Sequence, residues 1–287
     1  MAVDVNIWIL AVTGFGAGLL GSMMGVGGGI IIVPVLTLTM GIPIQYAIGG
    51  SLVSIVTNAL TATSIFIRKN MTNLKLGILL ATTLVPGAVV GALLATRLSS
   101  TVLILIFGIL LLYVAYTMIP KKQRKLTEEQ IELQKLVLEK SHARHAWLDD
   151  SYYDPAVNEE ISYQVHRPQV GVITGFFGGI ISSMLGVGGG IINVPVMSLI
   201  MKVPIKATIA TSSLLLCFTT MTGSMVYALN GYVLPQIIAP LTIGVYFGSM
   251  LGSSVAHKVH GLLLSRIFTV IIVLTAITMF LKALHVY

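Results

Sequence analysis

The chain has 287 residues, of which 55% are hydrophobic and only 9% are charged. Soluble domains carry about 25% charged residues, so this composition excludes a soluble globular protein, and continuously apolar runs exclude a membrane β-barrel, whose strands alternate. The formal net charge is +7, and the single cysteine, Cys217, excludes a disulfide framework.

The first unit, residues 1–119, contains apolar segments of two lengths. The long ones are close to the ~20 residues that cross ~30 Å of hydrocarbon as a helix; they are residues 7–24, 44–67, 76–96 and 102–119. Residues 30–40 form an apolar segment that is too short to span alone. We therefore predict that the glycine cluster Gly25–Gly29, which precedes this short segment, lies at membrane depth in a re-entrant hairpin.

Residues 120–167 differ in composition from the rest of the chain. They contain all the acidic residues except Asp4, and they begin with the basic run Lys121–Lys125. A capping-box pattern predicts a helix over about 127–145, and residues 149–160 are expected to form a loop. We interpret 120–167 as a solvated inter-repeat linker with one helix; a regulatory or dimerising role is the alternative.

Residues 168–287 repeat the first unit. The motif Gly21-Ser-Met-Met-Gly-Val-Gly-Gly-Gly-Ile-Ile-Ile-Val-Pro34 recurs without a gap as Ser182-Ser-Met-Leu-Gly-Val-Gly-Gly-Gly-Ile-Ile-Asn-Val-Pro195. Pro43 also matches Pro204 in the same register. Matching glycines and prolines indicate matching backbone geometry, so the chain is a duplicated unit. The segments expected in the second unit are 171–185, 191–201, 207–229, 235–256 and 262–284.

Positive charge changes sides between the two units. The loop at 68–75 is basic, whereas its counterpart at 229–235 has no charge. Conversely, 41–45 has no charge, whereas its counterpart at 202–206 contains two lysines. Lys and Arg concentrate in cytoplasmic loops, so we predict an all-α polytopic membrane protein of two inverted repeats. Each repeat has about five transmembrane or re-entrant segments, and the linker between them is cytoplasmic.

Inverted repeats with interrupted helices are typical of secondary transporters, whose site lies near the midplane where the two breaks face each other. Apart from Asp4, the two membrane units contain no Asp or Glu, so a cation would find no carboxylate there. The glycine turns instead offer unpaired backbone N–H groups at helix N-termini, where anions bind. The sequence therefore predicts a small anion as the substrate.

The candidate site combines these turns with a few side chains. An amide in lipid is costly unless it is used, which favours Asn58 and Asn193; the latter is matched by Ile32, so the two half-sites should be unequal. The alternative is that the glycine turns only pack helices. The candidate substrate-binding residues are Gly27, Gly28, Gly29, Gly188, Gly189, Gly190, Asn58, Asn193, Ser51 and Ser212. We expect no metal and no cofactor, because the six histidines lack metal-ligand spacing and the glycines lack the context of a dinucleotide fingerprint.

The doubled Gly-x-x-x-Gly-x-Gly-Gly-Gly-x-x-x-Val-Pro pattern, with Ser182 in place of the first glycine of the second copy, resembles the TauE/SafE sulfite exporter family. The resemblance covers both units but not the linker. It implies proton-linked transport of sulfite, organosulfonates or related oxyanions by a multi-pass protein of the cytoplasmic membrane. An anion channel of the same fold is the alternative, and a homodimer is left open. An intramembrane enzyme is disfavoured because the apolar segments contain no His or acid for a catalytic pair, and no nucleic-acid partner is expected.

Overall fold

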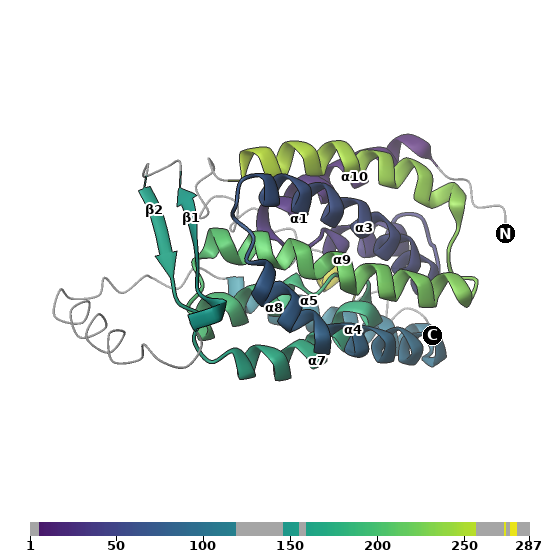
Figure 1. Ribbon diagram of the computed structural model, residues 1–287. Coiled ribbons are helices and arrows are strands. Elements are labelled where there is room, and N and C mark those ends of the chain that lie inside the picture. The colour runs from purple at the N-terminus through teal and green to yellow at the C-terminus, as the bar shows by residue number, and fades with distance from the viewer. Residues whose placement is uncertain (1–5, 119–145, 155–158, 257–272, 274–275, 280–287) are drawn as a thin grey trace.

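A computed structural model of the chain (Figure 1) describes residues 6–118, 146–154, 159–256, 273 and 276–279. Within these residues, six helices are long and apolar enough to cross a membrane. They are α1 Ile7–Met24, α3 Ile44–Arg68, α4 Leu74–Arg97, α7 Pro168–Leu185, α9 Ile205–Leu229 and α10 Pro235–Val255. The prediction of a polytopic helical membrane protein is confirmed at this level.

Three further apolar helices complete the described part of the two units. They are α2 Gly29–Leu38, α5 Ser100–Met118 and α8 Gly190–Pro195, which continues as the π-helix η2 Val196–Ile200. A short apolar helix therefore follows each glycine cluster, as predicted. The predicted linker helix over 127–145 lies outside the described residues, and so does most of the last predicted segment, 262–284.

The two units share helix boundaries because the residues that begin and end the helices recur. α1 ends at Gly25 and α7 at Gly186, both left-handed, with φ of 68° and 67°. α3 and α9 follow Pro43 and Pro204, and each has 25 residues. Glycine adopts the left-handed conformation at no steric cost, and a proline disfavours a helical residue before it. The recurring glycines and prolines therefore set the helix boundaries at equivalent positions in both units.

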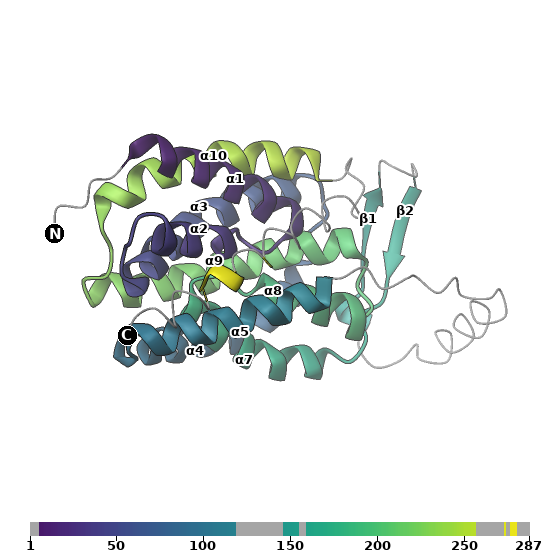
Figure 2. The same cartoon turned by 180° about the vertical axis from the view of Figure 1, so that it is seen from behind.

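α1 packs along α10 on one edge of the bundle, and α4 packs along α7 on the other (Figure 1 and Figure 2). A Cβ on Gly248 of α10 would overlap the carbonyl oxygen of Phe15, and a Cβ on Gly87 of α4 would overlap that of Phe176. These two contacts occupy equivalent positions of the repeat. Close backbone packing of this kind holds helices together in lipid, where no hydrophobic driving force acts between them.

α3 and α9 lie side by side between these edges and run in opposite directions. Near the start of α3, a Cβ on Gly49 would overlap the carbonyl oxygen of Tyr232, which follows the end of α9. Just beyond the end of α3, the backbone N–H of Asn73 donates to Oγ1 of Thr211, near the start of α9, at 3.1 Å. The middle of each helix therefore lies at the centre of the bundle, beside its counterpart from the other unit.

The described residues of the predicted loop 149–160 are mostly strand. β1 Asp150–Asp154 and β2 Glu159–Tyr163 pair as an antiparallel hairpin that follows the short 3-10 helix η1 Ala146–Leu148, at one end of the bundle (Figure 1). Tyr152 points inward and is 4% exposed, whereas its neighbour Tyr153 is 51% exposed. The loop prediction was wrong because a strand is stabilised by packing on one face, which outweighed the turn-forming residues around it.

The hairpin is docked onto the bundle by side chains and backbone. Nδ2 of Asn73 donates to the carbonyl of Leu148 at 2.8 Å and to the hydroxyl of Tyr163 at 3.3 Å. The backbone N–H of His166 donates to the carbonyl of Met201, at the end of η2, at 3.0 Å. The described end of the linker is therefore packed against the helices, and is not the solvated tether that was predicted.

Candidate functional site

The two glycine turns meet at the centre of the molecule. A Cβ on Gly29 would overlap the carbonyl oxygen of Gly186, and a Cβ on Gly190 would overlap that of Gly25. These two contacts occupy equivalent positions of the repeat. In each, the glycine that begins a short helix contacts the carbonyl of the glycine that ends the first helix of the other unit. Only glycine fits at these two crossing points.

Two serines join the turns across the units. Oγ of Ser51 in α3 donates to the carbonyl of Gly186 at 2.7 Å, and Oγ of Ser212 in α9 donates to the carbonyl of Gly25 at 2.8 Å. Both serines are fully buried. A hydroxyl has one proton, and these protons are used on carbonyl oxygens. Ser51 and Ser212 therefore fasten the turns and have no further proton to donate to an anion.

Asn58 lies against the first turn. Its Nδ2 donates to the carbonyl of Gly27 at 2.8 Å, while its Oδ1 has no hydrogen-bond partner in the described part of the chain. Gly27 and Gly28 have φ of 94° and 89°, which side chains other than glycine rarely adopt. Asn58 thus stabilises a turn that bends sharply toward α1, and it has an unused acceptor there.

The first turn is folded tightly onto α1. A Cβ on Gly21 would lie 2.5 Å from the backbone nitrogen of Gly28, and a Cβ on Gly28 would overlap the carbonyl oxygen of Ala17. The absence of a side chain at position 21 is what lets the turn approach the helix this closely. No side-chain-sized space is left between them.

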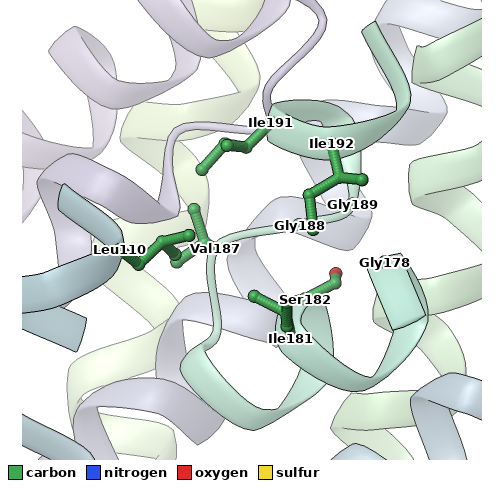
Figure 3. Close-up of a pocket in the computed structure, with 9 residues that line it drawn as sticks. All are labelled: Leu110, Gly178, Ile181, Ser182, Val187, Gly188, Gly189, Ile191 and Ile192. Carbon is green, nitrogen blue, oxygen red and sulfur yellow. The ribbon is translucent and has the colours of Figure 1, made fainter. Parts of the chain in front are cut away.

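The second turn is more open, because Ser182 stands where the first unit has Gly21. The Ser182 side chain holds the turn away from α7, and Gly189 takes the ordinary right-handed conformation, with φ of −64°, whereas Gly28 is left-handed. A small hollow of about 10 Å³ lies beside the turn (Figure 3). It is lined by Leu110, Gly178, Ile181, Ser182, Val187, Gly188, Gly189, Ile191 and Ile192.

Asn193 of α8 lies beside two of the glycines that line this hollow. Its Oδ1 would be 3.4 Å from a Cβ on Gly178, and its Nδ2 would be 2.9 Å from a Cβ on Gly189. Its carboxamide therefore lies between two of the lining glycines. Asn193 and Asn58 each serve one turn, but they come from different helices, α8 and α3, so the two turns are not chemically equal.

Backbone donors are available at both turns. Within the described residues, Gly28, Gly29 and Ile30 donate no backbone hydrogen bond, and Ile31 is the first residue of α2 to do so, to the carbonyl of Gly28. In the second unit, the first residue of α8 to donate is Ile192, to the carbonyl of Gly189. Unpaired N–H groups at the start of a helix favour negative charge nearby. Among the described residues, no group of three His, Cys, Asp or Glu side chains could hold a metal ion.

The structure thus separates the predicted site residues into three groups. The glycines at 27–29 and 188–190 form two turns that contact each other. Asn58 and Asn193 each lie against one turn. Ser51 and Ser212 donate hydrogen bonds to the carbonyls of Gly186 and Gly25, which hold the turns in place. Sequence reasoning did not single out Ser182 as a site residue. Its signal was present: Ser182 is a polar substitution at the first glycine of the motif.

The chain is similar to known membrane proteins over nearly its whole length. The family model described as Sulfite exporter TauE/SafE matches residues 10–279. The probable membrane transporter protein YunE of Bacillus subtilis (strain 168) is 28% identical over 273 residues, which cover 93% of this chain and 94% of that protein. The probable membrane transporter protein MJ0441 of Methanocaldococcus jannaschii is 27% identical over 272 residues, covering 88% and 86%. No solved structure matches the chain.

Proposed function

The chain belongs to the sulfite exporter TauE/SafE family, and we propose that it is a secondary transporter that moves a small sulfur-containing anion across the cytoplasmic membrane. It is a multi-pass membrane transporter and not an enzyme. Sulfite, an organosulfonate or a related oxyanion is the proposed substrate. The observation that carries this proposal is the contact between two glycine turns at the centre of a bundle whose described helices contain no acidic residue.

The proposed mechanism needs the two units to be inverted in the membrane. The opposite directions of α3 and α9, which are equivalent helices, support inversion. So does the exchange of charged loops between the units, because Lys and Arg concentrate on the cytoplasmic side. Rocking of one inverted unit against the other about a central site would then expose that site to each side in turn.

Cysteine labelling tests this orientation. In a Cys217→Ser background, a cysteine at Ser162 in the hairpin should react with a membrane-impermeant maleimide only from the cytoplasmic side. A cysteine at Asn230, in the loop between α9 and α10, should react only from outside. Both positions are exposed. If both cysteines react from the same side, the proposed topology and inversion are wrong.

We place the anion at the glycine turns, as two unequal half-sites. Gly28, Gly29 and Gly188–Gly190 would supply backbone N–H donors, with Asn58 and Asn193 beside them. The N–H of Gly27 already donates to the carbonyl of Gly21 at 3.3 Å, so Gly27 shapes the turn. Neutral donors suit an anion that must leave again, because they stabilise charge without forming a lasting ion pair. Ser51 and Ser212 act here as positioning residues, since their protons already hold the turns.

In this proposal the coupled proton crosses the membrane bound to the anion itself. The described membrane helices contain no Asp, Glu or His that could relay a proton. The second pKa of sulfite lies near neutrality, so transport of hydrogen sulfite would carry one proton with each anion. Coupling would then depend on the protonation of the substrate and not on a protein side chain.

Counterflow in proteoliposomes tests the transport proposal. Vesicles loaded with unlabelled sulfite and diluted into a trace of radiolabelled sulfite should accumulate label transiently above its external concentration. An alternating-access carrier produces this overshoot because it exchanges one anion for another. Empty vesicles and vesicles lacking the protein serve as controls.

An anion channel of the same fold remains the second candidate, and it would equilibrate the label without overshoot. Absence of any protein-dependent sulfite flux would remove sulfite as the substrate. A pH series adds the coupling test: sulfite uptake should fall as the pH rises through the second pKa of sulfite, and it should still do so after all six histidines are replaced by glutamine. Loss of the pH dependence in that variant would show a histidine relay instead.

A further inference from the structure

Ser182 and Asn193 are buried polar residues whose donors are unused. Their exposed fractions are 2% and 5%, and neither Oγ of Ser182 nor Nδ2 of Asn193 has a hydrogen-bond partner in the described part of the chain. Buried polar groups are normally paired, and an unpaired one calls for an explanation. Two such donors beside the same turn are an even stronger signal than one.

Both donors lie beside Gly189 of the second turn. A Cβ on Gly189 would lie 2.9 Å from Nδ2 of Asn193 and 3.8 Å from Oγ of Ser182, so the two groups approach one point from different helices. The Ser182 hydroxyl points toward the turn in Figure 3. The remaining side chains of the lining are aliphatic: Leu110, Ile181, Val187, Ile191 and Ile192.

The first unit has no such pair. Its equivalents of Ser182 and Asn193 are Gly21 and Ile32, which have no side-chain donor. The first turn is moreover folded onto α1, with the backbone nitrogen of Gly28 lying 2.5 Å from the position of a Cβ on Gly21. The donor pair and the hollow are therefore properties of the second unit.

We propose that Ser182 and Asn193 form the subsite that binds the anionic head of the substrate, and that this subsite selects singly charged sulfur oxyanions. This inference rests on the proposed transport function and names the substrate class within it. Two neutral donors satisfy oxygens that share one negative charge. A dianion such as sulfate would bury a second charge with no cation beside it and turn its other oxygens toward aliphatic walls, which is costly. The subsite should therefore favour hydrogen sulfite and short alkanesulfonates over sulfate.

Equilibrium binding of radiolabelled sulfite to the purified full-length protein, below the second pKa of sulfite, tests the subsite. Ser182→Ala and Asn193→Leu should each bind sulfite about ten- to hundred-fold more weakly, since each loses one hydrogen bond to a charged group. Ser22→Ala is the matched control: Ser22 is equally buried in the first unit, but its hydroxyl already contacts the carbonyl of Leu19 at 3.1 Å. Unlabelled methanesulfonate should displace the label from the wild-type protein, and sulfate should not.

Wild-type affinity in Ser182→Ala and in a folded Asn193→Leu would overturn the subsite, as would displacement by sulfate as effective as that by methanesulfonate. Ser182→Ala removes a single atom, so it keeps the test valid if Asn193→Leu does not fold. The two levels of failure are distinguishable. Sulfite counterflow by the wild type together with unaltered binding in the variants rejects the subsite alone. Absence of both counterflow and binding in the wild type rejects the transport of sulfite as well.

Discussion

Gly29→Ala and Gly190→Ala should each prevent the two units from packing together, and little folded protein should be recovered. A Cβ at either position would overlap a backbone carbonyl of the opposite turn, at Gly186 or Gly25. Backbone cannot move aside as a side-chain tip can. We therefore expect a loss of stability at or above the upper end of the ~1–3 kcal/mol that overpacking costs. The serine hydrogen bonds to the same two carbonyls would be strained with them.

The measurement is the thermal unfolding midpoint in detergent, together with the yield of monodisperse protein on size exclusion. Gly16→Ala is the control, because no atom lies within 4 Å of a Cβ placed there. Alanine also favours a helix over glycine, so this variant should unfold at or above the wild-type midpoint. A Gly190→Ala protein as stable as Gly16→Ala would show that the turns do not meet.

The repeated architecture could be predicted because it is written in residues that act on the backbone. Gly25 and Gly186 end matched helices in matched conformations, and Pro43 and Pro204 precede matched starts. Such residues act locally, so their spacing is informative without knowledge of the tertiary contacts. The lengths of the apolar segments predicted that these helices span a membrane.

The hairpin and the roles of the serines could not be predicted, because they depend on partners distant in sequence. The inward face of the hairpin is stabilised by packing of Tyr152 on the helix ends and by Asn73, which is far away in the chain. Ser51 and Ser212 look like available donors in the sequence. The acceptors of their hydroxyl protons are backbone carbonyls of the opposite unit, and no local pattern indicates them.

Gly28 and Gly189 also differ in a way that the sequence could not predict. They are equivalent in the motif, and the sequence assigns both the same role. In the structure, alanine at Gly28 would need a φ of 89° and would overlap the carbonyl oxygen of Ala17. Gly28→Ala should therefore destabilise the protein, and it cannot report on binding. Gly189 has a φ of −64°, which alanine adopts freely, so Gly189→Ala should fold.

Gly189→Ala should nevertheless lose anion binding. Its new Cβ would lie 2.9 Å from Nδ2 of Asn193, the donor that we assign to the substrate. The amide can turn away, which relieves the overlap at little cost in stability but withdraws the donor. Losing one hydrogen bond to a charged group costs about 1.5–3 kcal/mol, which corresponds to roughly ten- to hundred-fold in affinity.

Sulfite affinity of Gly189→Ala, measured by equilibrium binding beside its thermal unfolding midpoint, tests most directly whether the second glycine turn is the anion site. We predict an unfolding midpoint close to that of the wild type and an affinity about ten- to hundred-fold lower. A folded Gly189→Ala protein that binds sulfite as tightly as the wild type would contradict the assignment and would leave the turns as packing elements alone.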